Sequence, residues 1–166
     1  GMGQPQSREV MERGHAATVL PYDPVRDEVV LIEQFRIGPF AAGRHPWNIE
    51  VIAGIVEEGE TPEDVARREA VEEAGCSILG LVPIANVFPS AGAVSELNWH
   101  FVGHVDSTGV GGIYGLEHEG EDIKVRVVPR IQAEELMRQN RVGTGQALIS
   151  LLWLALNHQD LKARWT

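Results

Sequence analysis

The stretch AGIVEEGETPEDVARREAVEEAGC, residues 53–76, holds eight of the chain's 24 acidic side chains within 24 residues. Thr61 suits a helix N-cap, and Pro62 suits the first helical position. Gly75 stands where helices commonly end. These signals predict a helix over residues 62–74.

At 100° per residue, this helix carries one apolar stripe and one acidic stripe. Glu69 and Glu73 are four residues apart, with Glu72 beside both, so their charges repel one another. Arg68 can relieve Glu72, whereas Glu69 and Glu73 have no basic neighbour at helical spacing. The segment is either a solvated acidic face or a set of carboxylates that holds a divalent cation. The apolar stripe that we expect to pack on a sheet comprises Ala66, Ala70, Val71 and Ala74.

The composition bounds the class of protein. A chain of 166 residues with 43% hydrophobic and 23% charged residues suits one globular domain. Its net charge of −10 argues against nucleic acid or an anionic membrane as a partner. One cysteine excludes an internal disulfide, and no apolar run is long enough to span a bilayer. We therefore expect a cytoplasmic protein.

Apolar segments separated by turn residues predict the remaining elements. Strands that alternate with helices indicate an α/β fold, with helices packed on a mixed sheet. Glycine-rich loops are expected at 38–47 and 108–122. The expected strands are 15–23, 28–37, 48–54, 78–88, 97–106 and 123–130, and the expected later helices are 132–139 and 145–161.

The spacing within the acidic stretch follows a long pattern. Five residues separate Gly54 from Glu60, seven more lead to Arg68, and the run REAVEEAGC occupies 68–76. Every position agrees with the Nudix box, a signature of 23 residues, so the segment resembles the motif of Nudix hydrolases. That resemblance implies a Nudix fold, an α/β/α sandwich with a mixed β-sheet, over 14–166 after an N-terminal segment 1–13.

The resemblance also implies the chemistry. Nudix hydrolases cut a nucleoside diphosphate linked to another moiety and use Mg²⁺ or Mn²⁺, which neutralises the phosphates and acidifies a water. Arg68 and Glu60 resemble the pair that orients the metal-binding carboxylates. Glu73 is implied both as a ligand and as a catalytic residue. The full set of metal ligands implied is the carbonyl of Ala53 and the carboxylates of Glu69, Glu72, Glu73 and Glu121.

Over most of the chain, the resemblance extends to the ADP-ribose pyrophosphatase branch, through residues 12–36, the box, 116–128 and 156–165. It implies hydrolysis of ADP-ribose to AMP and ribose 5-phosphate. Glu119 is then expected as the catalytic base and Glu121 as a metal ligand, although the reverse assignment is nearly as well supported.

The same resemblance implies substrate contacts. Arg36 and Arg8 match positions that contact adenosine diphosphate, and Glu96 matches a position that binds the terminal ribose. Members of this branch carry an N-terminal subdomain that is exchanged in a homodimer, but only seven residues precede Arg8 here. We therefore expect most of that subdomain to be missing, and the sequence leaves the mode of dimerisation open.

Two other functions fit the sequence. One is hydrolysis of another nucleoside diphosphate sugar, such as GDP-mannose. The other is a non-catalytic Nudix module that senses nucleotides. Such modules typically lack box glutamates, and this chain retains all of them.

Overall fold

The computed structural model describes residues 3–115 and 120–166. One mixed sheet of eight strands forms its centre. The strand order is β5-β6-β1-β2-β8-β7, while β3 pairs with β2 and β4 pairs with β1. The elements in chain order are β1 (Ala16–Asp23), β2 (Glu28–Phe35), α1 (Ile37–Ala41), β3 (Trp47–Glu50), β4 (Ile52–Ile55), α2 (Pro62–Ala74), β5 (Gly80–Val87), β6 (Asn98–His104), β7 (Gly112–Tyr114), β8 (Ile123–Pro129), α3 (Arg130–Arg138) and α4 (Gly145–Trp165).

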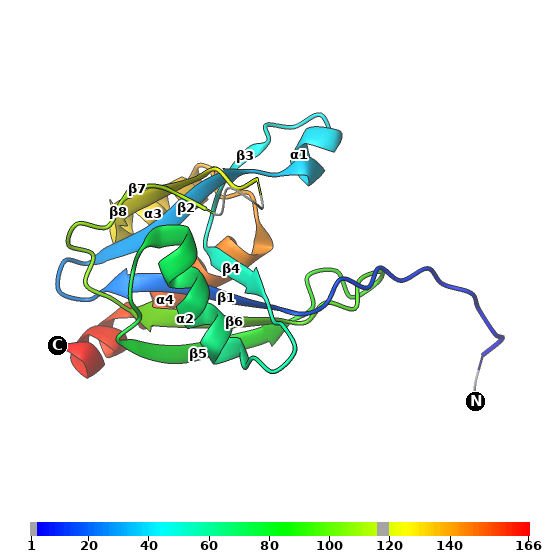
Figure 1. Cartoon of the computed structure of the whole chain (residues 1–166), viewed down its shortest axis with the longest axis horizontal. Helices are drawn as coiled ribbons and strands as arrows, with labels where there is room; N and C mark the ends of the chain where they lie inside the picture. The colour runs from blue at the N-terminus through cyan, green and yellow to red at the C-terminus, as the bar shows by residue number, and fades with distance from the viewer. Residues whose placement is uncertain (1–2, 116–119) are drawn as a thin grey trace.

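Helices cover both faces of this sheet (Figure 1). Helix α2 packs on one face, and α3 and α4 pack on the other. Strand β2 shows why both faces are apolar: Val30 and Ile32 belong to the core beneath α2, whereas Val29 and Leu31 belong to the core beneath α4. Successive side chains of a strand point to opposite faces, so a central strand must be apolar on both. The predicted α/β/α sandwich with a mixed sheet is confirmed.

The predicted helix over 62–74 is confirmed at both ends. The Thr61 hydroxyl accepts a hydrogen bond from the Asp64 backbone N–H, and the Asp64 carboxylate accepts one from the Thr61 N–H, which completes a capping box. Gly75 has φ 61°, in the left-handed region that ends many helices. Local signals alone were sufficient for this element.

The predicted apolar stripe of α2 is wrong at Val71, which is 54% exposed. Val65 is fully buried in its place. At 100° per residue, Val71 lies about 140° around the helix from Ala66, on the side away from the sheet. The three alanines of the stripe are buried as expected and bring the α2 backbone close to the strands.

The segment expected to form one strand over 48–54 is broken at Val51. Strand β3 pairs with β2, with Glu50 opposite Ile32, whereas β4 pairs with β1, with Ile52 opposite Val19. Strands β1 and β2 pair with each other only beside their hairpin, so beyond it they separate. The sheet therefore forks, with β1 and β4 on one branch and β2 and β3 on the other.

Smaller differences concern loops and helix ends. Helix α1 begins at Ile37, the last residue of the expected strand 28–37, and runs into the expected loop 38–47. Strand β7 lies within the expected loop 108–122. Helix α4 runs on to Trp165 instead of ending at 161. The Trp165 ring stacks on His104 with centroids 5.0 Å apart, which fixes the last turn of α4 against β6.

The N-terminal segment 3–13 is exposed throughout and extends away from the body of the protein (Figure 1). It lies beside the loop between β5 and β6, where the Met11 N–H donates to the Ala93 carbonyl at 2.8 Å. The Ser95 N–H donates back to the Met11 carbonyl at 3.1 Å. These contacts anchor only the base of the segment.

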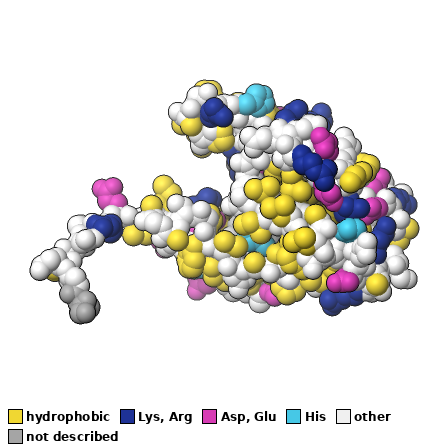
Figure 2. Space-filling model, turned by 180° about the vertical axis from the view of Figure 1, so that it is seen from behind, with side chains coloured by type: hydrophobic (Ala, Val, Ile, Leu, Met, Phe, Trp, Pro, Cys, Tyr) yellow, Lys and Arg dark blue, Asp and Glu magenta, His cyan; other side chains and the backbone are white. Residues whose placement is uncertain are grey.

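The face of the molecule that lies away from helix α2 carries a broad group of apolar side chains (Figure 2). Helix α4 covers the sheet on this side and exposes Leu148, Leu152 and Leu156, which recur at four-residue spacing. Among the described residues, no helix is long and apolar enough to cross a membrane.

Helix α4 offers a direct test of the core. Leu154 is fully buried, whereas Leu156 on the same helix is 86% exposed. Leu154→Ala should lower the free energy of unfolding by about 3 kcal/mol, because it removes apolar contacts and leaves a cavity. Leu156→Ala, the matched control, should change it by less than about 0.5 kcal/mol. Urea unfolding of both variants measures this, and equal effects would contradict the packing described.

Candidate active site

A cavity of about 880 Å³ lies in the fork of the sheet. Its wall includes residues of α2 and also Thr144 and Gln146 at the start of α4, although these helices cover opposite faces. The cavity therefore reaches both sides of the sheet through the gap between β1 and β2. Three arginines line it, and so do seven carboxylates, namely Glu50, Glu57, Glu69, Glu72, Glu73, Glu96 and Glu121.

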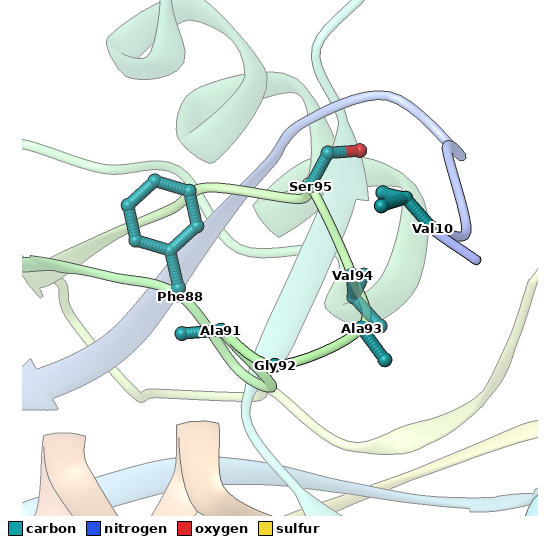
Figure 3. A pocket seen from close by; sticks show the side chains of 7 residues that line it. All are labelled: Val10, Phe88, Ala91, Gly92, Ala93, Val94 and Ser95. Carbon is teal, nitrogen blue, oxygen red and sulfur yellow. The ribbon is translucent and has the colours of Figure 1, made fainter. Parts of the chain in front are cut away.

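A second hollow, of about 300 Å³, lies between the N-terminal segment and the loop after β5 (Figure 3). Phe88 and Val10 flank it, and among the described residues that line it only Ser95 has a polar side chain. None of these described residues offers a charged group to a phosphate or a metal ion. The candidate active site is therefore the larger, acidic cavity.

Glu73 is the most buried carboxylate of α2, with 4% of its surface exposed. The Ala53 backbone N–H donates to its Oε2 at 3.1 Å, which ties helix α2 to strand β4. Burial, reinforced by the negative charge of Glu69, raises the pKa of Glu73 to about 8. A cation close to Glu73 would stabilise the charged form of this buried carboxylate.

Glu69 shares this environment. Burial raises its pKa to about 6, and the adjacent Arg68 guanidinium offsets part of the rise. Its carboxylate lies against the backbone of β4: a Cβ added at Gly54 would come within 1.7 Å of Glu69 Oε1. A side chain at this first glycine of the motif would therefore displace the Glu69 carboxylate from its place against β4.

Arg68 connects three carboxylates of the segment. Its Nε donates to Glu60 at 2.9 Å, and its Nη1 donates to Glu69 at 2.7 Å and to Glu72 at 2.9 Å. The expected pairing with Glu60 and Glu72 is confirmed. Glu69 has no basic neighbour at helical spacing, as expected, but Arg68 reaches it from the adjacent position, because the five donors of one guanidinium can bridge several acceptors.

The residues of this end of the cavity fit a divalent cation by their chemistry. Glu69 and Glu73 are oxygen donors of the kind that hard cations take, and burial raises the pKa of both, so a bound cation would stabilise their charged forms. As they stand, no three His, Cys, Asp or Glu side chains among the described residues converge as a ready-made ligand set. Arg68 donates a hydrogen bond to one carboxylate oxygen of Glu69 and to one of Glu72, so those two oxygens already have a partner.

Arg36, a predicted substrate contact, is held by a residue that sequence reasoning missed. Its Nη2 donates to Glu50 Oε2 at 2.8 Å, and its Nε lies 3.1 Å from the same oxygen. Glu50 is 6% exposed and lines the cavity beside Arg36. The available signal was that Glu50 is the only charged residue between Trp47 and Ile55.

The other predicted site residues are spread along the chain. Glu121 lines the cavity, and Glu119 lies outside the described residues. Glu96 is 5% exposed, lines the cavity and pairs with Arg13 at 3.3 Å. Arg8 lies in the exposed N-terminal segment, where its side chain bonds to neighbours of that segment. The structure thus gathers Arg36, Glu96, Glu121 and the α2 glutamates, but not Arg8.

Comparison with known proteins agrees with this geometry. The model of the NUDIX domain matches residues 12–148, which include all of α2 and both branches of the fork. The chain belongs to the Nudix family. Within this Nudix domain, the cavity lies between the box helix and the broken strand.

Relatives and a solved structure extend the comparison. The ADP-ribose pyrophosphatase of Escherichia coli (strain K12) is 50% identical over 158 residues, covering 95% of this chain and 76% of the relative. The GDP-mannose pyrophosphatase of Enterobacter sp. (strain 638) is 34% identical over 152 residues, covering 90% of this chain and 78% of the relative. A crystal structure of an ADP compounds hydrolase shares the fold, with TM-score 0.69 and 18% identity over 91% of this chain and 74% of that one. This Nudix chain falls in the ADP-ribose pyrophosphatase branch.

Gly54→Ala tests the close approach of Glu69 to β4. The added Cβ would collide with the Glu69 carboxylate, so Mn²⁺ affinity measured by calorimetry should fall by roughly 10- to 100-fold. Gly92→Ala is the matched control, because nothing lies within 4 Å of its added Cβ. Unchanged Mn²⁺ binding by Gly54→Ala would contradict the placement of Glu69.

The burial of Glu73 predicts a pH-dependent stability for the metal-free protein. Its folded pKa of about 8 exceeds the reference value of 4.5, so folding takes up a proton and the free energy of unfolding falls as pH rises between these values. Glu73→Gln should not show this decrease in the free energy of unfolding, because glutamine does not titrate. In EDTA at pH 8 it should be more stable than the wild type by about 4 kcal/mol, or roughly 8 to 16 °C in Tm.

At pH 5 the difference should shrink to about 1 kcal/mol, because Glu73 is then protonated in the folded protein and only partly protonated in the unfolded chain. Thermal unfolding at both pH values measures it. Glu63→Gln, a change on the exposed side of the same helix, is the control and should behave as the wild type at both. Equal Tm values for Glu73→Gln and the wild type at pH 8 would disprove the raised pKa.

Proposed function

We propose that this protein hydrolyses the diphosphate bond of ADP-ribose and releases AMP and ribose 5-phosphate. The observation that carries the proposal is the cavity in the fork, where the half-buried Glu69 and the buried Glu73 share one space with Arg36 and Glu96. One end of that space suits cations bound to phosphates, and the rest suits a nucleotide and a sugar. The Escherichia coli relative, an ADP-ribose pyrophosphatase at 50% identity, supports the choice of substrate.

A divalent cation, Mg²⁺ or Mn²⁺, is the proposed cofactor. Glu69 and Glu73 would be its direct ligands, and Glu72 would be shared or lie one step further out. The carbonyl of Ala53 and the carboxylate of Glu121 would complete the set. When bound, such a cation neutralises the diphosphate and lowers the pKa of a water.

The protein's own residues then orient and activate the reactants. Arg68 keeps the box glutamates in place, and the Ala53 N–H keeps Glu73 facing β4. Glu119 is the proposed base that accepts a proton from the attacking water. Glu121 lines the same cavity as the α2 glutamates and could exchange roles with Glu119.

The substrate contacts follow the two branches of the fork. Arg36, held by Glu50 on the β2–β3 branch, is proposed to contact the adenosine diphosphate, since a guanidinium pairs with phosphate or stacks on a base. Glu96 is proposed to accept hydrogen bonds from hydroxyls of the terminal ribose. Arg8 stays a predicted contact to adenosine diphosphate. A homodimer also stays a prediction.

Hydrolysis of GDP-mannose is the second candidate, favoured by the Enterobacter relative of that name at 34% identity. A nucleotide-sensing module is less well supported, because the box glutamates and Arg68 are all present and form one connected network.

Product analysis tests the proposed reaction. With Mg²⁺ and a panel of ADP-ribose, GDP-mannose, NADH and ADP-glucose, the protein should release AMP fastest from ADP-ribose. Glu73→Gln should lower the rate by at least about a hundredfold, because a proposed metal ligand loses its charge. Glu63→Gln should keep the wild-type rate. GMP released fastest from GDP-mannose would favour the second candidate, and tight nucleotide binding without turnover would favour the sensor.

A further inference from the structure

Asn98 is a polar side chain that neither the motif nor the proposed mechanism uses. It is the first residue of β6 and is only 2% exposed. The hydroxyl of Thr18, itself fully buried, donates to its Oδ1 at 2.8 Å. With Oδ1 turned toward Thr18, the amide Nδ2 of Asn98 lies on the other side of the side chain.

The amide nitrogen of Asn98 has no acceptor among the described residues. Among the described residues, the one fully enclosed side-chain nitrogen or oxygen without a partner is Nε2 of Gln34, so the Asn98 nitrogen keeps some accessible surface, where it can donate to a water or a ligand. Asn98 lines the large cavity in the fork. Its free N–H groups are therefore available to a molecule that enters this cavity.

The neighbours of Asn98 define the chemistry of this wall. Glu96, two residues earlier and also buried, offers a carboxylate as acceptor. Gln146 lines the cavity from the first turn of α4, and one turn later Ser150 contacts His100 of β6 at 3.4 Å, which places this end of α4 over the start of β6. Glu96 pairs at 3.3 Å with Arg13, which also lines the cavity, so this wall combines amide donors with a carboxylate whose charge is partly balanced. Such a set of donors and acceptors suits the hydroxyl groups of a sugar.

The position of Asn98 in the sheet decides which part of the substrate it meets. Asn98 pairs with Ala16 of β1, so it lies on the β1–β4 branch of the fork. Arg36 lies on the β2–β3 branch, where its guanidinium is held by Glu50. An asymmetric substrate with a diphosphate at its centre therefore meets the Arg36–Glu50 pair on one wall, and the Asn98 amide beside the Glu96–Arg13 pair on the other.

We propose that Asn98 is a specificity-determining residue, whose amide donates a hydrogen bond to a hydroxyl of the sugar attached beyond the nucleotide. Thr18 acts as a positioning residue, because it holds the Asn98 oxygen and so directs the nitrogen into the cavity. This inference rests on the proposed function, which supplies the class of substrate.

Binding of two uncleavable ligands tests the inference. One is α,β-methylene ADP-ribose, and the other is α,β-methylene ADP, which lacks the second sugar. With Mg²⁺ present, calorimetry should show that Asn98→Leu binds the first about tenfold more weakly than the wild type, the loss of one hydrogen bond. Its affinity for the second should not change. A loss of equal size for both ligands, or for neither, would overturn the inference.

Variants at Thr18 separate positioning from simple structural damage. Thr18→Val removes the hydroxyl at similar size, so it should weaken binding of the ADP-ribose analogue alone. Thr18→Ser keeps the hydroxyl and should restore the wild-type affinity. These two also serve as the test if Asn98→Leu does not fold, and equal behaviour of Thr18→Val and Thr18→Ser would overturn the positioning role.

The outcome is independent of turnover. If the wild type failed to cleave ADP-ribose while Asn98→Leu still lost affinity for the sugar-bearing ligand alone, the proposed reaction would fail and the role of Asn98 would stand. If ADP-ribose were cleaved while both ligands bound Asn98→Leu and the wild type equally, the reaction would stand and the role of Asn98 would fail.

Discussion

Negative charge buried between helix α2 and strand β4 is the constraint on which the site depends. Glu73 is almost fully enclosed, and its only described hydrogen bond comes from the Ala53 backbone N–H. Such burial needs a close approach of helix and strand. The alanines of α2 allow it on the helix side, and Gly54 allows it on the strand side because a Cβ there would meet Glu69. The same small residues therefore allow the close packing of α2 on β4 and place the carboxylates of the candidate metal site.

The fork in the sheet turns this acidic helix into a site. If β1 and β2 stayed paired along their length, the sheet would separate α2 from α4, and no cavity could receive side chains from both. The break at Val51 sends β3 to one strand and β4 to the other. It also gives the cavity two unlike walls, with Arg36 and Glu50 on one branch and Asn98 near the other. A substrate with two different ends can then bind in one direction.

Prediction from the sequence succeeded where the physical cause is local. The bounds of α2 followed from Thr61, Pro62 and Gly75, which act within one turn of the helix. The contacts of Arg68 with Glu60 and Glu72 followed from the motif and from helical spacing. The stripe assigned to α2 failed only at Val71, because its angular position was misjudged. The strand break at Val51 was missed, since an apolar segment does not show which neighbours its two halves will choose.

By itself, the sequence determined the family, the box helix and the carboxylates available to a cation, because these depend on residue types at short, fixed spacings. Only the tertiary structure decided what those groups face. Glu50 holds Arg36 from 14 residues away, and Thr18 orients Asn98 from 80 residues away. Neither pairing has a periodic signal in the chain. Both arise from the register in which distant strands meet, and that register is set by the packing of the whole sheet.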